Sequence, residues 1–478
     1  MLAVHGREVV AGALLGSLAA FLAVWTPTFP GAAVAAAMVA VAGGTWWLLA
    51  DGGRWPVAFL AAACLLPPVP LPWGDSGVHP AALIAAIGLW AGVLRPLDWD
   101  LRPGFLAVAL LLLVVTLLTS VPLAWLYSGA SVAAGSLLRV GLFAISVYLF
   151  FYLAYGPGRH VPAERIVRLL LRVGLLSAAF ATLDFYFQFP APARFANQFV
   201  WLSSGIYRRA QGVFYEASTL GLFCVFLLVL ALSILSMRMG GHLRLRTSWL
   251  LLACAIFLSA LIYSFSRAAV LNLAVAGGLL AWISPRRHRH TWRIARLTLA
   301  AALCVIAGFA LATYLFPEYT AAYLMRLQFS GEFLFSEPNV VLSRRLETWS
   351  TLFGFIAENP LRLLWGVGYK TLPYTDYFGG PVVADNMYLS LLIETGLPGL
   401  AALLLTCSAG LWQSLREARN GRTRTRRLCG RCLFCFWAGL MVQMLSGDLL
   451  TYWRVLPAFF ALLAIGARNE DPVPRPVQ

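Results

Sequence analysis

Long apolar runs alternate with short, arginine-rich segments along almost the whole chain. Most of the runs have roughly 17–25 residues, the length that an α-helix needs to cross a bilayer. The pattern predicts an all-α integral membrane protein with about 12–14 transmembrane helices, because a spanning helix satisfies its own backbone hydrogen bonds. The predicted crossings are 9–26, 32–50, 56–72, 80–94, 104–124, 133–154, 166–187, 213–237, 248–264, 268–284, 297–315, 387–412, 431–447 and 454–467.

The composition supports this interpretation and suggests an orientation. Of the 478 residues, 60% are hydrophobic and only 12% are charged, whereas soluble domains carry about 25% charged residues. The net charge of +16 comes from arginines in short segments between the apolar runs, which is the positive-inside pattern and not a nucleic-acid-binding surface. These segments and both termini are therefore predicted to face the cytoplasm. The segments are 94–103, 158–172, 238–246, 285–296 and 416–431.

Two substantial polar segments fall on the opposite, outer side. The longer one contains SRRLETWSTLFGFIAENP, whose apolar residues share one helical face. We expect an amphipathic helix on the outer membrane surface, capped by Ser343, ending at Asn359-Pro360 and followed by a turn at 365–369. Its apolar face is Leu346, Trp349, Leu352, Phe353 and Ile356. The predicted division is N-terminal helices 1–187, first outer loop 188–212, central helices 213–315, long outer loop 316–386, C-terminal helices 387–467 and cytoplasmic tail 468–478.

Six arginines lie on the outer side, where the positive-inside rule disfavours them. Guanidinium groups bind phosphate oxygens in pairs and stay charged, so the set is a candidate pyrophosphate site. Headgroup anchoring, or pairing with Glu216, Glu332, Glu337 or Glu347, is the alternative. The six are Arg208, Arg209, Arg267, Arg326, Arg344 and Arg345.

Two acidic positions are candidates for catalysis. Glu216 is expected about two turns into an apolar helix, where it either pairs with an arginine such as Arg267 or acts on substrate. Asp385 and Asn386 precede an apolar run, so Asp385 is either a helix cap or a general base. Deeper in that run, Glu394 precedes Gly396 and Pro398-Gly399, which should kink the helix.

Neither nucleotides nor metals are predicted to take part. The chain has no Walker A or Rossmann glycine pattern, and no histidine accompanies the outer arginines. We therefore expect no cofactor and no metal ion.

Three stretches together resemble the O-antigen polymerase and O-antigen ligase family of bacterial membrane glycosyltransferases. They are RRAQGVFYEASTLG, SFSRAAVL, and the long outer loop closing with NPLRLLWGVGYK and DNMYLSLLIETGLPG. The resemblance covers roughly residues 190–400. It implies a GT-C-like fold in the bacterial inner membrane, with the active face in the periplasm.

The resemblance also implies substrates and residue roles. The donor would be an oligosaccharide on undecaprenyl pyrophosphate, and the glycan would pass to an acceptor without metal or nucleotide sugar. Arg208 or Arg209, with Arg267, would bind the pyrophosphate; Arg326, or Arg344 with Arg345, would be the contribution of the long loop. Ligases of the family carry a His-Asn pair where this chain has Asp385-Asn386. That difference favours a polymerase, with Asp385 as general base and Asn386 and Tyr388 as further substrate contacts.

The leading hypothesis is a polymerase that joins lipid-linked repeat units of O-antigen, capsule or exopolysaccharide by inverting transfer. Its acceptor would be a second lipid-linked unit, and its further partners membrane lipids and a regulator of chain length. The main alternative is a ligase that uses the lipid A core or another acceptor. A flippase or secondary transporter is a weaker alternative, because the polar residues gather in the outer loops. A peptidoglycan polymerase of the shape, elongation, division and sporulation group is also weaker, because the SFSR stretch and the length of the 316–386 loop favour the leading hypothesis.

Overall fold

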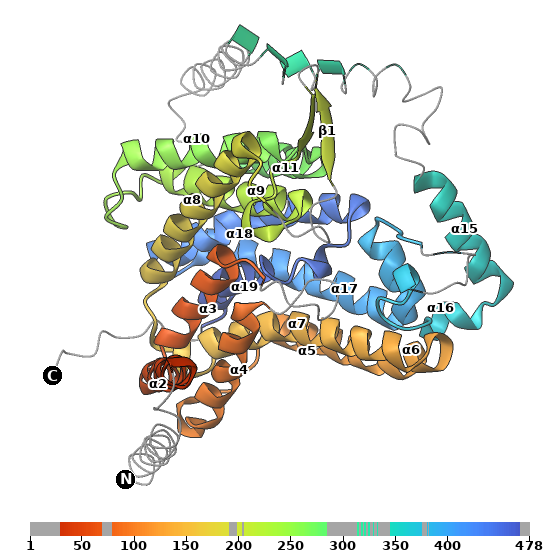
Figure 1. Ribbon diagram of the computed structural model, residues 1–478, viewed down its shortest axis with the longest axis horizontal. Coiled ribbons are helices and arrows are strands. Elements are labelled where there is room, and N and C mark those ends of the chain that lie inside the picture. Colours follow the sequence, from red (N-terminus) through yellow and green to blue (C-terminus); the bar gives the residue numbers. More distant parts are fainter. Residues whose placement is uncertain are drawn as a thin grey trace.

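The computed structural model is almost entirely helical (Figure 1). It describes residues 29–68, 79–190, 198–202, 205–283, 345–374 and 382–468, together with residue 380 and isolated positions between 313 and 332. The membrane helices are α2 (Phe29–Ala50), α3 (Arg54–Leu65), α4 (Pro80–Val93), α5 (Phe105–Thr119), α6 (Val121–Ser128), α7 (Ala130–Ala154), α8 (Ala163–Phe187), α9 (Ala217–Ser236), α10 (Thr247–Tyr263), α11 (Arg267–Ile283), α17 (Met387–Asn420), α18 (Arg424–Gln443) and α19 (Leu456–Ala467).

These helices confirm the predicted class, an all-α integral membrane protein. Among the described residues, six helical segments are long and apolar enough to cross a membrane, and six shorter apolar helices accompany them. One of the six long segments joins α5 and α6, which the sequence analysis expected as a single crossing at 104–124. The predicted crossings at 9–26 and 297–315 fall outside the described residues or almost wholly so.

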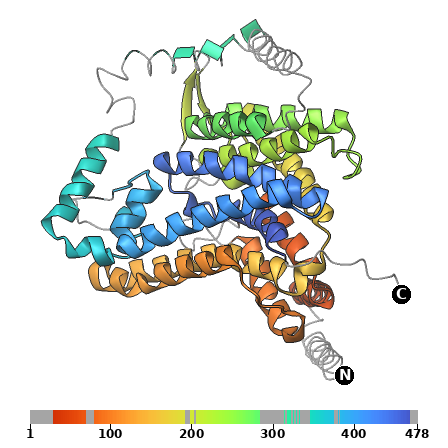
Figure 2. The same cartoon turned by 180° about the vertical axis from the view of Figure 1, so that it is seen from behind.

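Most of the helices lie side by side, and from α7 to α11 and from α17 to α19 successive ones run in opposite directions, whereas α6 continues the direction of α5 (Figures 1 and 2). The first residues of α9, α11 and α17 therefore lie at one end of the bundle, which we call the site end. The turns after α7, α9 and α17 lie at the other end, which carries most of the arginine-rich turns and which we call the arginine end. Both views show α15 (Arg345–Glu358) and α16 (Leu361–Trp365) at the site end.

Two helices extend further at the arginine end than expected. α17 continues to Asn420 instead of stopping at 412, and α18 begins at Arg424 instead of 431. The charged residues of this segment suggested a loop, but local contacts stabilise them in helical conformation. Thr423 caps α18 by accepting from the backbone N–H of Arg426, and the Arg426 guanidinium pairs with Glu417 on α17 at 3.0 Å.

The first outer loop forms a small hairpin that the sequence analysis did not anticipate. Strands β1 (Phe199–Leu202) and β2 (Gly205–Arg208) pair antiparallel, with Phe199 opposite Arg208. The hairpin stands beside the site end of α10 and α11 (Figure 1). It delivers Arg208 and Arg209 to the start of the next helical segment.

The predicted outer helix exists as α15, ending at Glu358 before Asn359-Pro360. Its buried residues are Leu352 and Phe355, and Trp349 and Ile356 pack on the same small core. Phe353, which was expected on the apolar face, is instead 55% exposed. The predicted cap, Ser343, lies outside the described residues.

The turn at 365–369 locks onto the first part of α17. The backbone N–H groups of Val367 and Gly368 donate to the carbonyl oxygens of Ile393 and Glu394 at 3.1 and 2.8 Å. Gly396 breaks the helix with φ 71°, which confirms the predicted kink. The backbone passes close to itself at Gly366, beside Glu394, and at Gly396, beside Leu364. A Cβ atom would clash at either position.

Substituting Gly366 by alanine is expected to lower the thermal stability. Gly366 has φ +75°, and an added Cβ would stand 2.5 Å from the backbone of Glu394. The clash and the positive φ together should cost about 2 kcal/mol or more. Thermal unfolding of the purified protein in detergent measures the effect.

Gly354 supplies the matched control, since it lies in α15 and a Cβ there would meet nothing within 4 Å. Gly354→Ala should be neutral or slightly stabilising, because alanine is the better helix former. Equal melting temperatures for Gly366→Ala and the wild type would contradict the tight packing of this turn.

Candidate functional site

The N-terminus of α17 shows whether Asp385 is a helix cap. The side chain of Asn386 caps the helix by accepting from the backbone N–H groups of Tyr388 and Leu389 at 3.0 and 3.2 Å. Asp385 is therefore not the cap. Its carboxylate instead accepts from Arg345 Nη2 of α15 at 3.2 Å and remains 48% exposed. Tyr388, expected as a substrate contact, donates its hydroxyl to the carbonyl of Met441.

A second acid–base group lies behind the turn at 365–369. Lys370 forms a buried ion pair with Asp448, in the segment between α18 and α19. The carboxylate of Glu394 lies close enough to interact with both, and it accepts from the backbone N–H groups of Lys370 and Leu372. Lys370 thus pairs with one carboxylate and lies within electrostatic reach of a second. It is also the single lysine of the chain.

Glu216 does not lie two turns into a helix, as was expected. It is the residue immediately before α9, because η3 (Gly212–Phe214) and a left-handed Tyr215 (φ 53°) delay the start of the helix. Glu216 Oε2 accepts from the Thr219 hydroxyl at 2.6 Å. Burial raises the pKa of the Glu216 carboxyl, while Thr219, the guanidinium of Arg454 and the hydroxyl of Tyr452 oppose this shift.

Tyr452 connects these groups. It is buried, and its hydroxyl hydrogen-bonds to Glu216. Burial raises the pKa of Tyr452, and the nearby carboxylates of Glu216, Asp448 and Asp385 raise it further. Tyr452 is therefore hydrogen-bonded to one acid, Glu216, and lies within electrostatic reach of two others. We call Arg345, Lys370, Asp385, Glu216, Asp448, Tyr452 and Arg454 the polar cluster.

Arg454 closes the cluster towards the first outer loop. It donates to the backbone carbonyls of Val213 and Phe214, and its guanidinium lies 5.4 Å from the centroid of the Phe214 ring. Burial lowers the pKa of Arg454 to about 10, with Glu216 opposing the shift. Arg454 remains a cation at neutral pH and helps to balance the acids of the cluster.

Arg208 and Asp184 form an ion pair that fixes the first outer loop. Arg208 Nη2 lies 2.6 Å from Asp184 Oδ1 of α8, and both side chains are largely buried. The backbone N–H groups of Gln211 and Gly212 also donate to Asp184. These contacts therefore support the alternative in which Arg208 pairs with an acid. The acid, Asp184, was not among the expected partners.

Arg209 and Arg267 lie next to each other along one edge of the site end. Arg209 Nε donates to the carbonyl of Ser264 at 2.7 Å, which ties it to the SFSR stretch. Arg267 is the first residue of α11 and is exposed. Asn272 of α11 donates a hydrogen bond to the side chain of Gln443 on α18 at 2.8 Å. Tyr388 of α17 contacts Met441 of the same helix, so α18 lies between α11 and the start of α17. Arg326 and Arg344 lie outside the described residues.

Several buried polar atoms of the site end have no hydrogen-bond partner among the described residues. They belong to Gln211 of the RRAQG stretch, to Arg345 and to two acids behind the turn. Because an unpaired buried polar group is costly, such atoms point to a place where a polar ligand binds. The atoms are Gln211 Oε1 and Nε2, Arg345 Nε, Glu394 Oε2 and Asp448 Oδ1.

A pocket of about 380 Å³ opens beside the Arg208–Asp184 pair. It lies between α3 and α8 and is mostly apolar, with Asp184 at its polar end. Its apolar wall includes Leu65, Leu176, Phe180 and Val213.

The sequence analysis missed four members of the polar cluster as functional candidates: Lys370, Asp448, Tyr452 and Arg454. The Lys370–Asp448 ion pair and the hydrogen bond from Arg454 to the Val213 carbonyl join residues 78 and 241 positions apart, which no local pattern reveals. The only sequence signal was the solitary lysine and the polar stretch 448–454 on the side predicted to be outer.

Part of the chain is similar to a known protein family. Residues 252–404 match the family described as O-Antigen ligase. No curated protein matches the chain. The matched region contains SFSR, α15, the turn at 365–369 and the N-terminus of α17, which are the same stretches that carried the sequence resemblance. The family implies membrane glycosyltransferase or ligase activity on lipid-linked glycans, and the match over residues 252–404 supports the predicted resemblance to the O-antigen polymerase and ligase family.

Proposed function

We propose that the protein polymerises oligosaccharide units carried on undecaprenyl pyrophosphate, at the periplasmic face of the bacterial inner membrane. The observation that carries the proposal is that Asn386, and not Asp385, caps the N-terminus of α17. Asn386 caps the helix, and Asp385 is left half exposed beside Arg345. A carboxylate that is not needed for capping and is accessible from outside the bundle can accept a proton from a sugar hydroxyl.

The proposed reaction is a single displacement. The acceptor hydroxyl oxygen bonds to the anomeric carbon, its proton passes to the Asp385 carboxylate, and the bond from the anomeric carbon to the pyrophosphate oxygen breaks. The lipid pyrophosphate leaves with the electron pair. Attack from the side opposite the leaving group inverts the anomeric configuration.

The arginines would stabilise the departing pyrophosphate. Arg345 lies beside Asp385 and has a buried Nε with no partner among the described residues. Arg209 and Arg267 occupy the α10–α11 edge of the site end. Fixed guanidinium groups near low-dielectric lipid stabilise developing negative charge more strongly than water does. We assign Arg208 a positioning role, because Asp184 holds it.

Glu216 is proposed as a positioning residue. It holds Tyr452 by a hydrogen bond and interacts with Arg454, and Tyr452 lies within electrostatic reach of Asp385. The apolar pocket beside Asp184 is suited to the first isoprene units of the lipid carrier, since it lies at the site end and is walled by Leu176 and Phe180.

The ligase remains the second candidate, because the matched family is described as O-Antigen ligase. The test is a deletion strain, complemented with the wild type, in which glycans are separated on a gel. A polymerase predicts that the deletion leaves single repeat units on the final acceptor and that complementation restores the ladder. A ligase predicts polymer retained on the lipid carrier and no glycan on the acceptor.

The two outcomes are distinguished by mild acid hydrolysis, which releases carrier-linked glycan but leaves acceptor-linked glycan in place. A normal ladder in the deletion strain would overturn both candidates. Accumulated polymer on the carrier would overturn the polymerase and support the ligase.

A further inference from the structure

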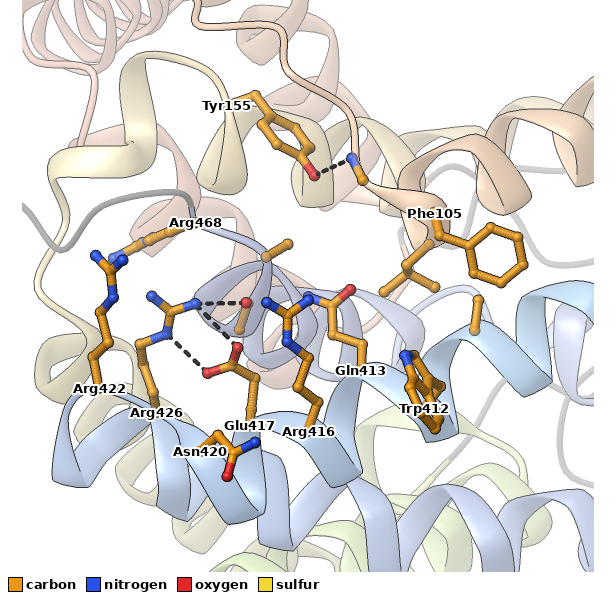
Figure 3. A pocket seen from close by; sticks show the side chains of 15 residues that line it. Phe105, Tyr155, Trp412, Gln413, Arg416, Glu417, Asn420, Arg422, Arg426 and Arg468 are labelled. Carbon is orange, nitrogen blue, oxygen red and sulfur yellow. Dashed lines mark hydrogen bonds and ion pairs between the residues drawn. The ribbon is translucent and has the colours of Figure 1, made fainter.

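A second pocket, of about 420 Å³, lies at the arginine end of the bundle, opposite the polar cluster. Figure 3 shows it between the end of α17, the start of α18, the end of α19 and the start of α5. The proposed glycosyl transfer makes no use of it. Its lining is unusually cationic, with four arginines and one glutamate.

Two of the four arginines are held by hydrogen bonds to the protein. Arg426 pairs with Glu417 and donates to the carbonyl of Gly466 at 2.8 Å. Arg468 donates to the carbonyls of Leu153 and Val161. These contacts hold the wall of the pocket together and use its only acid.

Arg416 and Arg422 differ from this pair. Both line the pocket and are exposed, and neither makes a hydrogen bond or ion pair with the part of the chain that the structure describes. With Glu417 taken by Arg426, no acid of the lining remains to balance them. The pocket therefore presents two unneutralised guanidinium groups, which suit a phosphate group.

The other end of the pocket is aromatic. Trp412 is 67% exposed and Phe105 is 58% exposed, and both line the same cavity. Trp412 stands one helical turn before Arg416 on α17, and Figure 3 shows the aromatic side chains apart from the arginines, towards one side of the pocket. Exposed tryptophan beside arginine at a helix end is typical of the membrane interface.

We propose that this pocket binds the phosphodiester headgroup of an anionic phospholipid from the leaflet at the arginine end. Arg416 and Arg422 would hold the phosphate, and the acyl chains would leave past Trp412 and Phe105. Basic pockets between transmembrane helices on the positively charged side are suited to such headgroups. The proposal is independent of the role of Asp385.

Phosphate chemistry is shared by a lipid headgroup and a free anion, so the experiment separates the two. The full-length protein, purified in an uncharged detergent, is heated with phosphatidylglycerol, with phosphatidylcholine or with inorganic phosphate. We expect a concentration-dependent rise in melting temperature with phosphatidylglycerol alone. In Arg416→Gln/Arg422→Gln the apparent affinity for phosphatidylglycerol should fall about tenfold or more, since each arginine adds to the attraction.

Arg419→Gln is the matched control, because Arg419 is exposed on the same helix but does not line the pocket. It should keep the wild-type response, and Trp412→Ala should weaken the response to lipid. An unchanged response in the double variant would overturn the proposal. A stabilisation by inorganic phosphate as strong as that by phosphatidylglycerol would also overturn it, in favour of a free-anion site.

Discussion

Asp385→Asn is expected to reduce polymer formation about a thousandfold, because general base catalysis contributes roughly 10²–10⁴ in rate. Asparagine is the sharpest substitution at this position. Asp385 has φ 46°, a left-handed conformation that asparagine adopts readily and alanine does not. The helix cap is untouched, since Asn386 supplies it. Glycan laddering in the complemented deletion strain, with protein amounts measured in the membrane fraction, checks the result.

Glu358→Gln is the control for the loss of an exposed carboxylate. Glu358 is the last residue of α15, the helix that carries Arg345; it pairs with Arg362 of α16 at 3.9 Å and is 77% exposed. It should leave the ladder unchanged. A full ladder from Asp385→Asn at normal protein amounts would remove Asp385 from the reaction and leave it as the partner of Arg345.

Lys370→Met should produce the largest loss of stability. Lys370 is buried between Asp448 and Glu394, so its removal leaves two acids without their cation. Breaking a buried pair by removing one partner costs about 3 kcal/mol or more. Asp448→Asn should cost less, because Lys370 keeps Glu394 as a partner. Thermal unfolding followed by size-exclusion chromatography of the purified protein measures both variants.

The critical result is that Lys370→Met lowers the stability more than Asp448→Asn does. The double variant Lys370→Met/Asp448→Leu should be more stable than Lys370→Met alone, since only one acid is then unpaired. Arg102→Met is the control for an exposed pair, because Arg102 contacts Asp100 at 3.2 Å and is 80% exposed; it should cost about 1 kcal/mol or less. If Lys370→Met were as mild as Arg102→Met, the buried pair would not support the turn.

The apolar pattern predicted the helices because membrane crossing depends on local composition. The observed ends of α4, α8, α10 and α11 differ from the predicted ones by at most three residues. α9 begins at Ala217 instead of 213 because of the turn before it, and the errors at the arginine end fall where charge was taken to mean a loop. At the junction of α17 and α18, Glu417 and Arg426 neutralise each other across the turn, so the helices continue into polar sequence.

The site was only partly predictable for a related reason. Asp385 and Glu216 stood out as acids near apolar runs, and in the structure both lie within electrostatic reach of Tyr452. Whether Asp385 or Asn386 capped α17 depended on backbone geometry, which the sequence does not contain. The partner of Arg208 was missed because Asp184 lies inside a long apolar helix, although an acid in such a place is itself a signal.

The break at Gly396 divides α17 into two mechanical parts. The first part, Met387–Thr395, is bonded through Ile393 and Glu394 to the turn at 365–369, and it is separated from the longer remainder by a non-helical residue. Asp385, Lys370 and α16 are therefore attached to the same short segment of α17. A glycan that shifts this segment would move the proposed base and the buried cation together, while the long arm of α17 and its arginine end stay in place.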